Sequence, residues 1–122
     1  MDAANLVEQY LDTWNETDPH ARGSAVASIW AEGARYVDPL ADVAGRDEIS
    51  ALIGAVQEQV PEHVFRLGDN AVDAHHNVVR FSWELVPASG GEPLAIGFDV
   101  AVTDEDGRIG SVLGFLDKAP GA

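Results

Sequence analysis

The sequence contains no cysteine, so it excludes a disulfide framework, a thiol nucleophile and a cysteine-based metal site. Histidine is sparse too, with 4 in the chain, and no His-Glu-x-x-His or comparable spacing occurs. His75 and His76 are adjacent in the sequence, and adjacent residues on a strand point to opposite faces. We therefore expect no bound metal and no other cofactor.

Positive charge is also scarce, since 7 Lys and Arg stand against 21 Asp and Glu, a formal net charge of −14. Such a chain is repelled by phosphate backbones and by anionic membrane surfaces, so neither nucleic acid nor a membrane is an expected partner. No apolar run approaches the roughly 20 residues that span a bilayer. The acidic N-terminus lacks the basic start of a signal peptide, which favours a cytoplasmic protein.

Glycine-rich phosphate loops and Gly-x-Ser-x-Gly elbows are absent as well, so nucleotide binding and serine hydrolysis find no support. What the chain does have is apolar content: 46% of its 122 residues, including three Trp, are hydrophobic. This length and composition predict one globular domain over residues 1–122.

Three amphipathic segments open the chain. The spacing predicts helices over residues 2–16, from the Asp18-Pro19 cap to about Trp30, and from Asp47 to just before Pro61. Their shared apolar faces should be buried, which concerns Leu6, Trp14, Val26, Ile29, Leu52, Ile53 and Val56.

The remaining segments alternate with a period of two. They predict strands over residues 34–38, 63–67, 71–74, 79–85, 94–103 and 108–116, with a loop over 40–45. Three helices followed by an antiparallel meander form an α+β pattern, in which the helices cover one face of a curved sheet. The late strands carry apolar residues on both faces, for example Phe98, Val100, Leu113 and Phe115. A large apolar patch is unusual on a monomer, so we expect a homodimer through the outer sheet face.

Asp99 is the most informative polar residue because it lies inside an apolar strand. A carboxylate buried there without a partner costs several kcal/mol or stays protonated, and a protonated carboxyl can donate a hydrogen bond to an oxyanion. Alternation offers the opposite interpretation. Leu94, Ile96, Phe98, Val100 and Val102 share one strand face, which would leave Asp99 facing solvent.

Two further residues have an ordinary and a functional interpretation. Asp38 precedes Pro39 and is therefore extended, so it could be a base at the mouth of a cavity or simply begin a turn. Tyr10 shares a helical stripe with Leu6 and Trp14, so it could be a core aromatic or could point its hydroxyl into a pocket.

Four segments together, residues 10–15, 34–39, 45–49 and 106–109, resemble the nuclear transport factor 2-like superfamily in its SnoaL-like branch. The resemblance implies a cone: a curved antiparallel sheet wrapped on three helices around an internal pocket, in a homodimer. It covers nearly the whole chain and is specific for the fold, whereas members of this superfamily differ in activity.

Within that superfamily, the arrangement of Tyr10, Asp38-Pro39 and Asp99 is similar to the site of ketosteroid isomerase. The similarity implies that Asp38 is the catalytic base and that Tyr10 and a protonated Asp99 hold an enolate oxygen, with the Tyr10 hydroxyl in hydrogen-bond reach of Asp99. The lining it implies consists of Trp14, Val79, Phe81, Trp83, Ala101, Val112, Gly114 and Leu116. The hairpin over residues 86–93 and the stretch between Asn15 and Asp38 are longer than in that enzyme.

The predicted function is proton transfer next to a carbonyl of a small hydrophobic ligand. A non-catalytic dimeric ligand-binding or accessory domain is the alternative. An epoxide hydrolase site needs Arg-x-Asp where this chain has Arg80-Phe81-Ser82, and a polyketide cyclase needs an acid in the region of Gly114. Both activities therefore fit less well.

Overall fold

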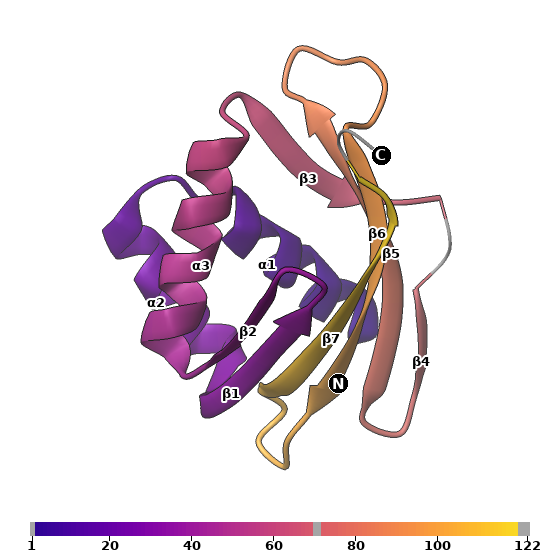
Figure 1. Cartoon of the computed structure of the whole chain (residues 1–122). Helices are drawn as coiled ribbons and strands as arrows, with labels where there is room; N and C mark the ends of the chain where they lie inside the picture. The colour runs from indigo at the N-terminus through magenta and orange to yellow at the C-terminus, as the bar shows by residue number, and fades with distance from the viewer. Residues whose placement is uncertain (1, 70–71, 120–122) are drawn as a thin grey trace.

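Three helices lie on one side of a curved sheet of seven strands (Figure 1). The computed structural model describes residues 2–69 and 72–119. The helices are α1 (Ala3–Asn15), α2 (Pro19–Ile29) and α3 (Arg46–Gln59). The strands are β1 (Trp30–Asp38), β2 (Ala41–Ala44), β3 (His63–Leu67), β4 (Asp73–His75), β5 (Val78–Pro87), β6 (Ala95–Thr103) and β7 (Ile109–Lys118).

The first two helices begin at the predicted caps. Asp2 accepts a hydrogen bond from the Asn5 N–H, and Asp18 accepts one from the Ala21 N–H, directly before Pro19. A carboxylate at this position satisfies an N–H group that the helix leaves without a partner. α3 begins without a side-chain cap, after Gly45 at φ 90°, a conformation that glycine adopts without strain.

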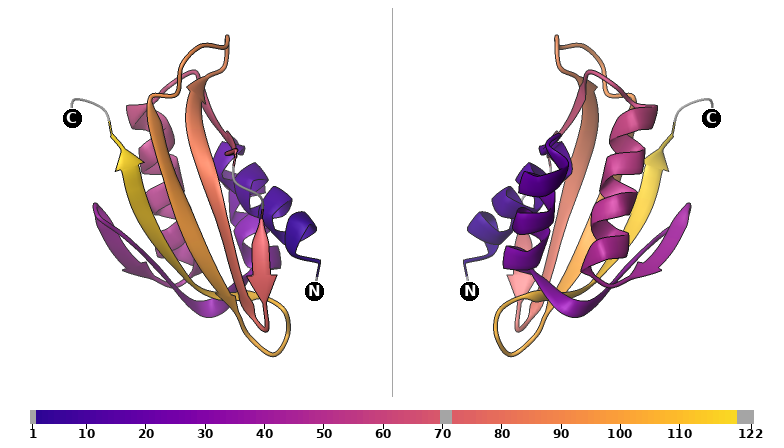
Figure 2. Two further views of the ribbon diagram at one scale, coloured as in Figure 1. Left: turned by 90° about the vertical axis from the view of Figure 1, so that its right-hand side faces the viewer. Right: turned by 90° about the vertical axis from the view of Figure 1, so that its left-hand side faces the viewer.

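The sheet order is β2-β1-β7-β6-β5-β3, with β4 paired to β5. β1 and β7 are parallel, whereas the other pairs are antiparallel. The expectation of a purely antiparallel sheet is therefore wrong at this one pair. The last strand, β7, lies on the side of β1 opposite β2 and runs in the same direction as β1, because a long stretch of chain separates the two strands. Figure 2 shows all three helices on the same side of the resulting mixed sheet.

The first strand also differs from the prediction. Trp30 is its first residue rather than the end of α2, and the expected loop over residues 40–45 contains β2, which pairs with Arg35–Asp38. Ala71, the first residue of the strand predicted over 71–74, lies outside the described residues, and β4 covers Asp73–His75. No helix in the described part of the chain has the length and apolar character needed to cross a bilayer.

The helices and the concave sheet face enclose the core. Five of the residues predicted to be buried there are buried, namely Leu6, Trp14, Val26, Ile29 and Ile53. Leu52 and Val56 are only partly buried, at the edge of the same cluster. Along β6 the buried residues are Ala95, Gly97, Asp99, Ala101 and Thr103, while the larger apolar residues between them are half-buried on the outer face.

Candidate functional site

Asp99, Gly114 and Asp38 lie in one row across three neighbouring strands. Asp99 on β6 pairs with Gly114 on β7, and β7 pairs in parallel with β1 up to the residue before Asp38. A Cβ placed on Gly114 would lie 2.8 Å from Asp99 Oδ1, 3.3 Å from Asp38 Cβ and 3.6 Å from the Tyr36 hydroxyl. With no side chain at Gly114, the two acids and a tyrosine approach one another on the concave face.

Asp99 is buried, with 3% of its surface exposed, and both carboxyl oxygens are hydrogen-bonded. The Tyr10 hydroxyl donates to Oδ2 at 2.7 Å, and Trp83 Nε1 donates to Oδ1 at 3.1 Å. Burial raises the pKa of Asp99 to about 6, although these two hydrogen bonds lower it, and the nearby charge of Asp38 also raises it. The solvent-facing interpretation of Asp99 is therefore wrong.

The Tyr10 side chain extends from α1 toward the concave face of the sheet, where its hydroxyl contacts Asp99. Burial raises the pKa of Tyr10 well above its ordinary value, and the charge of Asp99 raises it further. The hydroxyl therefore stays protonated and remains a hydrogen-bond donor. The ring packs in the core as well, at 5.3 Å from the Phe81 ring, so the core interpretation and the hydroxyl in the site hold together.

Asp38 ends β1 and is half-buried. Its Oδ1 accepts hydrogen bonds from the N–H groups of Leu40 and Ala41, each at 2.8 Å, and its Oδ2 accepts one from the Tyr36 hydroxyl at 2.6 Å. The residue therefore begins the β1–β2 turn and also lies beside Asp99. The turn interpretation of Asp38-Pro39 therefore holds. The same hydrogen bonds keep the Asp38 carboxylate beside Asp99.

Tyr36 is a site residue that the sequence reasoning missed. It is 5% exposed, and burial raises its pKa far above the ordinary tyrosine value, with the charges of Asp99 and Asp38 adding to the effect. Strand periodicity offered a signal, because residues two apart on a strand share a face and Asp38 follows Tyr36 by two. The N–H of Trp83 was also missed, since Trp83 was considered only as lining.

The predicted lining forms three rows across the concave face. Val79, Ala101 and Val112 share the first row, Phe81 and Gly114 the second, and Trp83 and Leu116 the third. Aromatic rings from α1 and β3 lie over these rows, with centroid distances of 5.4 Å for Trp14–Phe65, 5.5 Å for Trp14–Tyr36 and 5.5 Å for Phe65–Trp83. The inner wall of the site is therefore largely aromatic.

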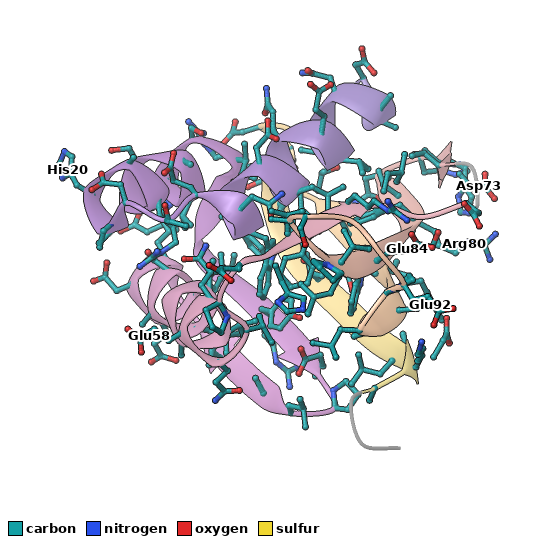
Figure 3. The ribbon with its side chains drawn as sticks, turned by 90° about the horizontal axis from the view of Figure 1, so that it is seen from above. His20, Glu58, Asp73, Arg80, Glu84 and Glu92 are labelled. Carbon is teal, nitrogen blue, oxygen red and sulfur yellow. The ribbon has the colours of Figure 1, made fainter. Side chains whose placement is uncertain are left out.

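Two cavities lie elsewhere in the structure. One of about 500 Å³ is lined mainly by α1 and α2, and one of about 250 Å³ lies beside Arg22 and Gln57. Neither includes Tyr10, Asp38 or Asp99. Figure 3 shows side chains gathered between the helices and the sheet, with most of the labelled residues around the periphery. The internal pocket stays a prediction.

Within residues 2–69 and 72–119, no group of three or more His, Asp and Glu is placed to hold a metal ion.

Comparisons with known proteins identify the fold and the domain family. A family model described as a SnoaL-like domain matches residues 7–112. A proposed isomerase of the SnoaL-like family from Agrobacterium tumefaciens is 40% identical, over 94% of this chain and 97% of that one, with a TM-score of 0.89. No curated protein sequence matches.

Two more distant structures share the fold. A proposed ketosteroid isomerase from Kribbella flavida is 20% identical over 97% of this chain and 79% of its own, with a TM-score of 0.69. A proposed polyketide cyclase from Sinorhizobium meliloti is 15% identical over 90% and 93%, also with a TM-score of 0.69. At these identities the likeness concerns the fold alone, so the chemistry has to be argued from the residues of this chain.

Proposed function

The chain belongs to the SnoaL-like domain family, and from that membership we propose that it is a small acid–base enzyme, which moves a proton next to the carbonyl group of an apolar ligand. The observation that carries the proposal is the buried hydrogen bond between Tyr10 and Asp99, beside Asp38. It pairs two buried groups that can hold a proton, and the half-buried carboxylate of Asp38, a proton acceptor, lies beside them.

The proposed reaction begins at Asp38. Its carboxylate removes a proton from the carbon next to the carbonyl, and the bonding electrons move onto the carbonyl oxygen to give an enolate. Asp38 then returns the proton at a conjugated carbon, so the double bond shifts and no co-reactant is consumed. A positioned general base contributes about 10²–10⁴-fold to such a step.

Tyr10 and Asp99 stabilise the enolate oxygen in this scheme. The Tyr10 hydroxyl donates to Asp99 in the structure. Once Asp99 binds a proton, which its pKa of about 6 brings close to neutral pH, Asp99 can donate to the Tyr10 oxygen and Tyr10 can donate to the enolate. Each well-placed donor in a site of this kind is worth about 3 kcal/mol in the transition state. The burial of both groups supports the scheme, because water cannot compete for their hydrogen bonds.

The test is proton exchange on β,γ-unsaturated ketones, from one ring to four, followed by NMR in deuterated water. Wild-type protein should exchange the α-proton and shift the double bond, and Asp38→Asn should lower the rate by at least about 100-fold. Asp42→Asn is the matched control, since Asp42 lies on the neighbouring strand, 59% exposed and paired with Arg35. An Asp38→Asn variant as active as wild type would refute the proposed base.

A specific observation favours the alternative of a non-catalytic ligand-binding domain. Three hydrogen bonds already occupy the Asp38 carboxylate, two of them from the backbone of the β1–β2 turn. An acid held this firmly suits a structural role. Ketone binding by the wild-type protein without any proton exchange would decide for this alternative.

A further inference from the structure

Arg22 is a buried arginine that pairs with no carboxylate among the described residues. It lies on α2 with 8% of its surface exposed. The ion pairs that the described residues form involve other arginines, namely Arg35, Arg66 and Arg80. Removing a guanidinium from water without an opposite charge is costly, so arginines are almost never buried unless they are paired. In a chain with 21 Asp and Glu, the absence of such a pair needs an explanation.

The acidic residues closest to Arg22 do not neutralise it. Asp18 accepts the Ala21 N–H as the cap of α2, and the Glu16 carboxylate accepts the Asp18 N–H. Glu58, on α3, lines the cavity beside Arg22, but it is exposed and forms no ion pair with Arg22. The guanidinium is therefore a buried positive charge that none of these three carboxylates contacts.

One side of the Arg22 guanidinium is held in place by α3 and by the chain just after α1. Nη1 donates to the Glu16 carbonyl at 3.3 Å and to Gln57 Oε1 at 3.1 Å. The Gln57 amide is itself fixed, since its Nε2 donates to the carbonyls of Trp14 and Glu16 at 2.8 Å each. The position of the guanidinium is therefore set by the fold, and a ligand would not have to order it.

The opposite side carries two nitrogens that donate to none of the described residues. Nε is buried without an acceptor, and both hydrogen bonds that the Arg22 side chain forms come from Nη1. The N–H groups of Nε and Nη2 point in the same direction, which matches the two oxygens of a carboxylate. Arg35 shows this pairing within the same chain, since its Nε and Nη2 lie 3.0 Å and 2.9 Å from the two carboxylate oxygens of Asp42.

The cavity beside Arg22 has a volume of about 250 Å³. Gly54 on α3 lines it and makes room for the guanidinium, because a Cβ at this position would lie only 2.7 Å from Nη2. Nη2 is therefore next to a residue of the cavity wall. Cavities for drug-sized ligands measure roughly 300–1,000 Å³, so this one suits a smaller molecule.

We propose that this cavity binds a small monocarboxylic acid, with Nε and Nη2 of Arg22 donating to its two carboxylate oxygens. A ligand with a single negative charge fits best, because Glu58 at the cavity and the net charge of −14 repel polyanions. The inference does not rest on the proposed function, since none of Tyr10, Asp38 and Asp99 lines this cavity.

Titration of ¹⁵N-labelled protein with propionate tests the proposal. Propionamide is the neutral probe of the same shape, and inorganic phosphate is the tetrahedral anion. The Arg22 Nε–H signal should move downfield with propionate, and propionamide should bind at least about 10-fold more weakly, because hydrogen bonds between charged groups are the stronger ones.

Two variants with matched controls locate the site. Arg22→Gln should weaken propionate binding at least about 10-fold, whereas Arg35→Gln, which removes the same charge from the surface, should leave the affinity unchanged. Gly54→Ala favours helix α3 but displaces Nη2, so it should weaken binding without lowering the temperature of unfolding. Gly23→Ala on α2 is its control, since a Cβ there meets nothing within 4 Å.

The Gly54→Ala variant decides the question if Arg22→Gln does not fold. Equal affinity for propionate and propionamide, equal losses in Arg22→Gln and Arg35→Gln, or unchanged propionate binding by Gly54→Ala would each overturn the proposal. Phosphate binding more tightly than propionate would overturn the carboxylate as the ligand. A wild-type protein without proton exchange on ketones would refute the proposed enzyme and leave this site standing, because its readouts are binding and thermal unfolding.

Discussion

The carboxyl group of Asp99 titrates where water hardly reaches it. Burial raises its folded-state pKa to about 6, against 3.8 for an unperturbed aspartate. Between these two pH values the folded protein holds a proton that the unfolded chain has already released. The contribution of Asp99 to the free energy of unfolding therefore falls as the pH rises from about 4 to about 6, because the unfolded state binds fewer protons at this residue.

Asp99→Asn removes this titration and keeps the shape of the side chain. The amide can accept from Trp83 and donate to the Tyr10 oxygen, so the local hydrogen bonds have a substitute. At pH 8 we expect the variant to be more stable than wild type, by up to roughly 3 kcal/mol, and at pH 4 to be about equal.

Urea unfolding of both proteins across this pH range measures the difference, and the subtraction cancels the other carboxylates. A gap that is constant with pH would contradict the raised pKa of Asp99.

The side chain of Asn15 makes two hydrogen bonds between helix α1 and strand β3. Asn15, the last residue of α1, donates from Nδ2 to the Phe65 carbonyl at 2.8 Å and accepts the Phe65 N–H on Oδ1 at 2.8 Å. β3 is an edge strand of the sheet, and Phe65 packs against Trp14 and Trp83. The contact therefore sets where one aromatic wall of the site lies.

Asn15→Ala should destabilise the protein by about 1–3 kcal/mol, since it leaves two backbone groups of Phe65 without their partners. We expect hydrogen exchange to accelerate first in β3, while β6 and β7 stay protected. Asn5→Ala serves as the control, because Asn5 is exposed on the same helix. Uniform acceleration across the sheet would show that β3 is not the element that Asn15 holds.

The helices were predictable because their signals are local. Caps such as Asp2 and Asp18, together with apolar spacing, lie within each segment. β2 was missed because Pro39 and Gly45 enclose five residues that resemble a loop. The pairing of β2 with β1 supplies the stabilisation that its own residues do not. The parallel pairing of β1 with β7 has no local signal, since nothing within either segment specifies its neighbour.

For the site, the residues alone left two interpretations of Asp99 open. The alternation of residues along β6 suggested the wrong orientation for Asp99. The larger apolar residues, such as Ile96 and Phe98, lie on the outer face, while the small residues line the core. The contact between Tyr10 and Asp99 spans 89 residues and followed only from the family resemblance. The family and the fold were predictable; the roles of Tyr36 and Trp83 required the structure.

The outer face of the sheet carries an apolar patch on β6 and β7, in a molecule with a net charge of −14. Phe98 and Phe115 stack on it with centroids 4.9 Å apart, and Leu113 and Phe115 are 42% and 51% exposed. Exposed apolar groups that gather on one face mark a contact surface. We propose that a second copy of the chain covers this face.

Phe115→Glu should convert the dimer to a monomer, because it would place a charge without a partner in the interface. Leu40→Glu is the control: Leu40 is 86% exposed, yet it lies at the β1–β2 turn rather than on this face. Light scattering at micromolar concentration reads out the mass. A wild-type protein that is already monomeric at that concentration would contradict the dimer.

The parallel pairing of β1 with β7 has a consequence for synthesis on the ribosome. β1 ends at Asp38, whereas β7, its neighbour in the sheet, begins only at Ile109. A nascent chain can form its helices early, but Asp38 has no strand between itself and Asp99 until the final strand has emerged. Such distant pairing delays folding. The two acids are therefore brought together last, and an unfinished chain carries both of them without the arrangement that joins them.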